Sequence, residues 1–263
     1  RHPGHYPRVL ISQHWCILLL LVKLNMVNSL FKCTSALEMS RENNLELSPL
    51  TALSPLDGRY ATRVGVLRNH FSEFGLIRYR VMIEVRWLAY LAGEPGISEL
   101  PPLSREANDF LDRLVNDFSL ADAQRIKAIE HDTNHDVKAI EYYIQGKVKK
   151  ALHPWIHFAL TSEDVNNLSY SLMWQDGLKQ VYLSALQSVN KELKKLARKY
   201  KNASMLALTH GQPATPTTFG KELAVFCARL DRQVHQIKSH KLMGKFGGAT
   251  GTWSAHMAAY QKT

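Results

Sequence analysis

One imidazole, that of His210, lies in a stretch bounded by Gly and Pro residues that separates two long helical patterns, Thr209–Pro216. A histidine side chain can donate or accept a proton near neutral pH, and neighbouring hydroxyl and amide groups can fix its tautomer. Thr209 and Gln212 supply such groups. The alternative is a loop histidine that packs between helices. Because two further polar clusters occur at similar junctions, we interpret this stretch as part of a site.

These two clusters, Thr133–Asp136 and Thr161–Asp164, each stand directly ahead of a helical pattern. The first places His135 at a helix N-terminus, where backbone N–H groups and the helix dipole favour an anion. The second has the Thr-x-x-Asp spacing of a helix cap. Capping alone would explain Thr161 and Ser162, but a helix N-terminus with free hydroxyl groups is also a carboxylate site. The two clusters therefore predict anion binding.

A third candidate for anion binding is the segment Ser54–Tyr60, which has the composition of a tight turn. It presents Arg59 and Tyr60 at the surface. A guanidinium group offers a bidentate fork to a phosphate, and a phenol adds a hydroxyl group. The alternative is an ordinary turn with a solvated arginine.

Between these clusters the apolar residues recur at intervals of three and four, which predicts helices. From residue 163 to about 201 there is no proline, and a helix of that extent would be on the order of 57 Å long. Such a length favours an all-α, elongated helical bundle. The expected domains are an upstream or targeting-like segment, an N-terminal helical domain and the first part of a long-helix domain: 1–44, 45–152 and 153–263. The helices are expected at 76–91, 104–118, 119–130, 136–144, 163–201 and 219–237.

The formal charge of +10 is compatible with nucleic acid, a membrane surface or an anionic small molecule as partner. The Lys and Arg residues are spread along the chain. The densest run, Lys191–Lys201, lies on a helical pattern and is interpreted as the solvent-exposed face of that helix. We therefore expect an anionic small molecule and no nucleic acid. The Gly-rich segment 247–251 lacks the strand, helix and lysine of a phosphate loop and is expected to be a close-packing turn.

The N-terminal 38 residues have a composition unlike the rest, because the first acidic residue is Glu38. Their apolar run, 15–22, is shorter than the roughly 20 residues that a membrane span needs, so no membrane association is expected. We interpret residues 1–38 as upstream or targeting sequence. The three cysteines, at positions 16, 33 and 227, show no disulfide or zinc spacing. A cytoplasmic location is the expectation, with an organellar location as the alternative if residues 1–38 are a transit peptide.

Four motifs in order give the sequence a family resemblance, and together they cover the chain from about residue 45. They resemble the adenylosuccinate lyase family of the fumarase/aspartase superfamily, and they are Ser54–Tyr60, Thr133–Ala139, Thr161–Asn167 and Thr209–Pro216. The resemblance implies β-elimination of fumarate from adenylosuccinate and from the succinyl-carboxamide ribotide of purine biosynthesis. A base removes a proton next to a carboxylate, and an acid protonates the leaving nitrogen.

Site residues can be assigned position by position from this resemblance. His210 matches the general acid and His135 the second active-site histidine, which Asn134 and Asp136 place. Thr161 and Ser162 match the residues that hold the succinyl carboxylate, and Arg59 and Tyr60 those that hold the nucleotide phosphate. Thr209 and Gln212 are expected to contact the substrate beside His210. The resemblance implies no metal and no redox cofactor.

The resemblance also implies a homotetramer whose long helices form a shared bundle, with each active site built from more than one subunit. The family's catalytic base is a serine on a loop of the type Ser-Ser-x-Met-Pro-x-Lys-x-Asn, and no such segment occurs in the sequence. We therefore expect this chain to show little activity alone. The alternatives are a non-catalytic helical fragment that assembles with a full-length lyase, a truncated gene product, or a sister lyase acting on another succinyl substrate.

Overall fold

The computed structural model describes residue 51, residues 56–57 and residues 60–260. The predicted site residue Arg59, and the segment 1–38 interpreted as upstream or targeting sequence, lie outside the described residues. The chain divides into two compact units. The first contains Arg80–Leu168 and the residues from Gly244 onward; the second contains Ser169–Met243 and the described residues up to Tyr79. The domain boundary predicted at residue 152 stays a prediction.

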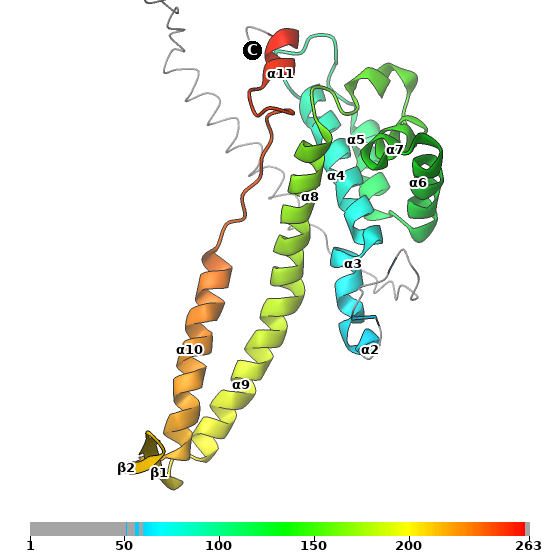
Figure 1. Ribbon diagram of the computed structural model, residues 1–263. Coiled ribbons are helices and arrows are strands. Elements are labelled where there is room, and N and C mark those ends of the chain that lie inside the picture. Colours follow the sequence, from blue (N-terminus) through cyan, green and yellow to red (C-terminus); the bar gives the residue numbers. More distant parts are fainter. Residues whose placement is uncertain (1–50, 52–55, 58–59, 261–263) are drawn as a thin grey trace, which may run out of the picture. The chain divides into compact units, whose positions relative to one another are not determined.

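Helices make up most of the first unit (Figure 1). It holds the greater part of α4 (Glu73–Ala92), all of α5 (Arg105–Asn116), α6 (Leu120–Thr133), α7 (Asp136–Gln145) and α11 (Ser254–Ala259), and the start of α8 (Ser162–Asp176). A short 3₁₀ helix, η3 (Lys150–Trp155), precedes α8. Helix α6 begins with a capping box in which Ser119 and Asp122 satisfy each other's backbone N–H groups. Helices α4 to α7 and the start of α8 agree with the predicted ranges, whereas η3 and α11 were not predicted.

Helix α4 is the central helix of the first unit. Most of its side chains there are buried: Val81, Ile83, Val85 and Leu88 are each at most 1% exposed, while Arg86 lies nearer the surface. A helix that is buried over most of its circumference is expected in a protein core. Two charged residues, Arg80 and Glu84, are nevertheless buried in it.

The second unit contains the remainder of the predicted long helix. The helical run from α8 continues through a π-helical turn, η4 (Gly177–Tyr182), into α9 (Leu183–Lys199). A side chain at Gly177 would lie 2.5 Å from the ring of Phe71. Glycine therefore permits the close contact between this turn and α3 (Arg68–Phe71). Two short elements, α2 (Ala61–Val64) and η2 (Gly65–Leu67), precede α3.

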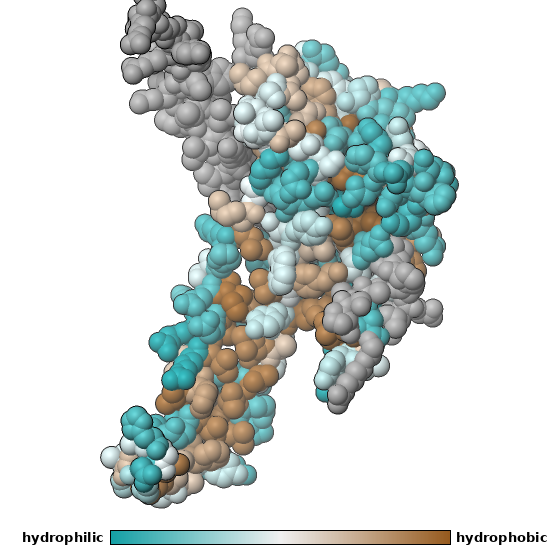
Figure 2. Space-filling view, viewed as in Figure 1, coloured by the Kyte–Doolittle hydropathy of each residue, from teal (hydrophilic) through white to brown (hydrophobic). Residues whose placement is uncertain are grey.

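Helix α10 (Phe219–Ser239) packs along α9, and the two run side by side from the hairpin that joins them (Figure 1). A Cβ atom at Gly220 would lie 2.4 Å from the carbonyl oxygen of Ala197, so the two backbones approach closely there. Large apolar side chains are exposed along this pair, including Val189, Leu196 and Phe226 at 55%, 40% and 54%. Figure 2 shows hydrophobic residues gathered along it. Of these exposed residues, Val189 and Leu196 belong to the predicted long helix.

Between α9 and α10 the chain forms a β-hairpin, which the sequence analysis interpreted as a loop. Strands β1 (Ser204–Thr209) and β2 (Gln212–Thr218) pair in antiparallel fashion, with an irregularity between Leu206 and Leu208. Prolines in a segment argue against a central strand because they remove a backbone donor. In a sheet of two strands both are edge strands, so β2 can hold Pro213 and Pro216. The all-α prediction is otherwise confirmed.

Candidate active site

The first part of the candidate site is the turn between α6 and α7. Asn134 ends α6 with a left-handed backbone, φ 51°, and His135 caps α7. The Nδ1 atom of His135 accepts a hydrogen bond from the N–H of Lys138 at 3.1 Å. An accepting Nδ1 carries no proton, so the neutral ring holds its proton on Nε2. The imidazole is half exposed and can present this N–H to a ligand. The predicted position of His135 at a helix N-terminus is confirmed.

A buried arginine joins this turn to the start of α8. Arg80 Nη2 donates to Asp136 Oδ2 at 2.6 Å, and Arg80 Nε donates to Asn166 Oδ1 at 2.9 Å. Partial burial acts to raise the pKa of Asp136, but the Arg80 charge and the N–H of Val137 outweigh it and lower the pKa. Asp136 is therefore a carboxylate whose position is fixed. The sequence analysis missed Arg80.

The start of α8 is held by the buried carboxylate of Asp164. It accepts from the N–H of Thr161 at 3.0 Å, which is one half of a capping box. It also accepts from the N–H groups of Gly247 and Gly248, each at 3.0 Å, and from Lys245 Nζ at 2.7 Å. The glycine segment is thus a close-packing turn, as expected. Thr161 and Ser162 lie partly exposed above this anchor.

The structure therefore brings two of the predicted clusters together in the first unit. Arg80 contacts Asp136 of the first cluster and Asn166, which lies one helical turn beyond Ser162 of the second. Both clusters stand at helix N-termini, where unpaired N–H groups and partial positive charge favour an anion. The arrangement suits a carboxylate ligand.

His210 lies in the second unit, at the turn of the β-hairpin. His210 and Gly211 have φ values of 51° and 75°, which is the left-handed pair that a tight two-residue hairpin turn requires. The flanking residues Thr209 and Gln212 pair with each other across the strands. All of these side chains are exposed. The tight turn thus projects the imidazole from the end of the α9–α10 pair.

Tyr60 also belongs to the second unit. It occupies the N-cap position of α2 and is 48% exposed, so its side chain reaches the surface as expected. The predicted phosphate clamp of Arg59 and Tyr60 stays a prediction because Arg59 is not described.

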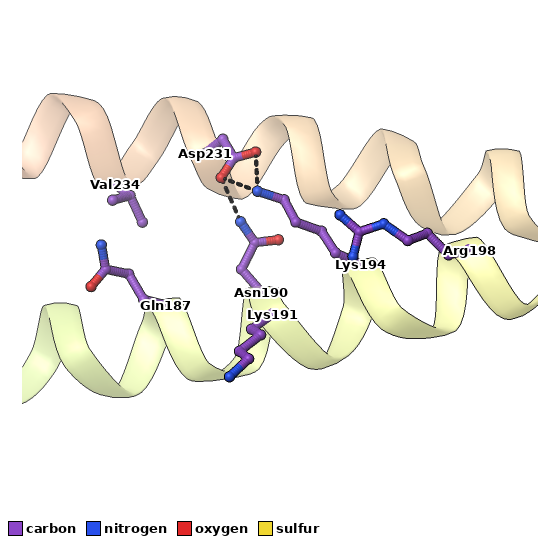
Figure 3. A pocket seen from close by; sticks show the side chains of 7 residues that line it. All are labelled: Gln187, Asn190, Lys191, Lys194, Arg198, Asp231 and Val234. Atoms are coloured by element: carbon purple, nitrogen blue, oxygen red, sulfur yellow. Dashed lines mark hydrogen bonds and ion pairs between the residues drawn. The ribbon is translucent and has the colours of Figure 1, made fainter.

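A separate pocket of about 320 Å³ lies between α9 and α10 (Figure 3). Asp231 accepts from Asn190 at 2.7 Å and from Lys194 at 2.9 Å inside it. None of the predicted site residues lines it. Its lining residues are Gln187, Asn190, Lys191, Lys194, Arg198, Asp231 and Val234.

None of the helices within residues 60–260 combines the length and the apolar character that crossing a membrane requires. In the same residues, no group of three or more His, Cys, Asp and Glu side chains is placed to hold a metal ion.

Comparison with known proteins identifies the family. A family model described as Lyase matches residues 58–263. The chain belongs to this lyase family. It is 50% identical over 221 residues to an adenylosuccinate lyase of Haemophilus influenzae and 48% identical over 221 residues to that of Escherichia coli K12. In both cases the match covers 82% of this chain and 48% of the relative. The resemblance to adenylosuccinate lyases is thereby confirmed, and the chain spans about half the length of these relatives.

Solved structures of the superfamily share the fold. A fumarate lyase from Mesorhizobium sp. BNC1 gives a TM-score of 0.60 at 24% identity, over 74% of this chain and 45% of that one. A β-carboxy-cis,cis-muconate cycloisomerase from Acinetobacter calcoaceticus gives a TM-score of 0.56 at 20% identity, over 74% and 46% of the two chains. At these identities the likeness concerns the fold alone, and it agrees with the predicted bundle of the fumarase/aspartase type.

Proposed function

We propose that this chain contributes part of the active site of a lyase that releases fumarate from adenylosuccinate, giving AMP, and from the succinyl-carboxamide ribotide. The observation that carries the proposal is the Arg80 contact. It joins the Asn134–Asp136 turn to the start of α8 in a chain about half identical to adenylosuccinate lyases. Two helix N-termini beside one another suit the succinyl carboxylates of such a substrate.

The elimination needs a base, a stabilised carbanion and an acid. In the proposed reaction a base, which is none of the residues assigned here, takes the proton next to a carboxylate. The C–N bond then breaks, and the leaving nitrogen takes a proton from an acid as fumarate forms. We assign that proton to His210 as general acid. His135 would donate its Nε2–H to the substrate, and Thr161 and Ser162 would hold a carboxylate. Thr209 and Gln212 would contact the substrate beside His210, and Arg59 with Tyr60 the phosphate.

His210 and the residues around His135 belong to different units, and His210 is exposed on a hairpin turn. A site completed by other copies of the chain fits this distribution. The exposed apolar residues of the α9–α10 pair favour burial against further helices, since contiguous apolar surface of this kind marks interaction sites. We therefore propose a homo-oligomer, a tetramer in its complete form, in the cytoplasm, with an anionic nucleotide as its substrate.

The test is complementation. The chain is folded together with the Haemophilus influenzae adenylosuccinate lyase that carries Asn at the histidine aligned with His210, and the fall in adenylosuccinate absorbance is followed. We expect activity to return in the mixture, while the chain alone shows little. A chain with His210→Asn should restore nothing. A chain with His240→Asn, another exposed histidine of the second unit, should restore as much as the wild type.

Failure of the wild-type chain to restore turnover, although it co-assembles with the relative, would contradict the assignment of His210. Failure to co-assemble would contradict the proposed oligomer. Substantial turnover by this chain alone would contradict the expectation that it needs a partner.

A further inference from the structure

The segment that leads into α8 is held in an unfavourable backbone conformation. Two of its residues that are not glycine, His157 and Ala159, have φ values of 60° and 58°. Residues with a Cβ atom rarely adopt this left-handed backbone region, and each residue held there costs roughly 1 kcal/mol or more of conformational free energy. The segment ends at Thr161 and Ser162. Something in the surrounding structure must therefore fix it.

The carboxylate of Glu84, on the central helix α4, contacts this segment at two points. Glu84 Oε2 accepts from the backbone N–H of His157 at 3.1 Å, and Glu84 Oε1 lies 2.6 Å from His157 Nδ1. The Glu84 side chain is fully buried. One carboxylate thus holds both the backbone and the ring of the strained residue. Trp87, one turn further along α4, donates its Nε1–H to the carbonyl oxygen of Phe158 at 2.8 Å.

Charges on α7 complete the surroundings of His157. Glu141 Oε1 lies 4.0 Å from His157 Nε2, and Lys138 Nζ lies 2.7 Å from Glu141 Oε2. Burial acts to lower the pKa of His157, but the carboxylates of Glu84 and Glu141 outweigh it and raise the pKa. Burial raises the pKa of Glu84, with His157 opposing. A proton held between His157 and Glu84 lets the pair stay in the core, because buried charges are tolerated when paired.

The path from this pair to the candidate site is short. The carbonyl oxygen of His157 accepts from the N–H of Leu160 at 3.1 Å. The next residue, Thr161, donates its N–H to Asp164. Each backbone group named here has a partner, so displacement of His157 would displace Thr161 and Ser162 with it.

We propose that Glu84 is a positioning residue that acts through His157 to hold Thr161 and Ser162 where they bind a substrate carboxylate. That Thr161 and Ser162 bind a substrate carboxylate rests on the proposed function above. Arg80, Glu84 and Trp87 are spaced at i, i+4 and i+7 on α4, so one face of this helix orients both clusters of the site.

The test compares Glu84→Gln with Val85→Ala in the full chain. Gln has a single acceptor oxygen and no charge, so it loses the charged contact with a protonated His157 ring. Its NH2 group can face Nδ1 only when the ring is neutral and Nδ1 carries no proton. Val85 is the adjacent residue of α4, is fully buried and has no polar side-chain atom, so its truncation lowers stability without removing a hydrogen bond to the segment. Amide hydrogen exchange of residues 158–162 and the NMR titration of the His157 ring report position. Fumarate is the ligand probe, followed through the Thr161 and Ser162 amide signals.

We expect Glu84→Gln to speed exchange in residues 158–162 about tenfold and to weaken fumarate binding about tenfold. The pKa of His157 should fall, because the adjacent carboxylate charge is gone. Val85→Ala should leave the His157 pKa and fumarate binding unchanged, and it should not speed exchange in residues 158–162 more than elsewhere in the unit. Equal hydrogen-exchange rates in residues 158–162 for the two variants would overturn the positioning role, whatever the result for fumarate binding. Faster exchange in Glu84→Gln with no fumarate response in the wild type would support the positioning role and overturn the carboxylate site.

Discussion

The two units differ in what their polar side chains do. In the first unit, Arg80 and Glu84 are charged, buried in the central helix, and paired with the turn and segment that carry the candidate site. In the second unit, the α9–α10 pair has apolar side chains exposed to solvent and holds His210 at its end on an exposed turn. The α9–α10 pair of the second unit therefore has apolar surface that another surface could bury.

The buried charged pairs of the first unit and the exposed apolar face of the second have different energetic consequences for the candidate site. A buried charge costs several kcal/mol unless it is paired, so the pairs in α4 fix the geometry of their partners. An exposed apolar helix face costs stability and solubility until another surface covers it. The residues around His135 therefore have fixed positions within one unit, while His210 lies on an exposed hairpin turn at the end of the α9–α10 pair.

The largest effect is expected from Arg80→Met. The change leaves Asp136 and Asn166 without their buried guanidinium partner and should lower the free energy of unfolding by roughly 3 kcal/mol. The control is Arg86→Met on the same helix. Arg86 pairs with Asp112 near the surface, with side chains 22% and 46% exposed, so its loss should cost about 0.5 kcal/mol. Urea unfolding measures both. Equal losses would show that Arg80 is no more important than a surface ion pair.

The second prediction concerns the pH dependence of stability. It rests on a buried polar cluster of the second unit, formed by His70, Tyr79 and Asp176. His70 Nδ1 lies 3.2 Å from the hydroxyl group of Tyr79, which donates to Asp176 at 2.7 Å. The His70 ring is 1% exposed and lacks a partner on Nε2 among the described residues. Burial and the Arg78 charge lower the pKa of His70 to about 4. This cluster holds a neutral imidazole.

The lowered pKa makes stability depend on pH. His70 binds its proton more weakly in the folded chain than in the unfolded chain, so its contribution is complete above about pH 6.5 and is lost as the pH falls toward about 4. The two pKa values of His70, 6.5 and about 4, correspond to roughly 3 kcal/mol, and the raised pKa of Asp176, caused by burial, offsets part of this loss. Urea unfolding at about pH 7 and pH 4.5 should show less acid dependence in His70→Asn. The exposed His131 provides the control, and His131→Asn should keep the wild-type dependence.

Much of the fold could be predicted because its signals are local. The helix starts predicted at Ser104 and Ser119 and the predicted position of His135 follow from short-range spacing. In the structure these three residues cap α5, α6 and α7. The apolar stripe of the long helix follows from periodicity alone.

The missed features depend on contacts between distant parts of the chain. Arg80 and Asn166 are 86 positions apart, and Glu84 and His157 are 73 apart. Their only local signal is a charged residue within an otherwise apolar helix, which implies a buried partner without saying where it lies. The β-hairpin was missed because Pro213 and Pro216 argue against a strand unless both strands are edges.

The smallest expected effect comes from a pair of Asn→Leu changes, one in each unit. Asn190, in the α9–α10 pair (Figure 3), is 4% exposed and gives its amide to Asp231, but its Oδ1 has no partner among the described residues. Asp231 would keep its contact with Lys194. Replacing a half-satisfied polar group by an apolar one of similar size is nearly neutral, so Asn190→Leu should change the unfolding free energy by less than about 0.5 kcal/mol.

Asn167→Leu in the first unit is the matched change. The Asn167 side chain accepts from the N–H of Lys245 at 2.6 Å and donates to the carbonyl oxygen of the same residue at 2.8 Å. Its loss leaves both backbone groups unpaired and should cost about 2 kcal/mol. Urea unfolding of the two variants compares them directly. A cost for Asn190→Leu as large as that for Asn167→Leu would mean that polar contacts order the α9–α10 pair as firmly as they order the first unit.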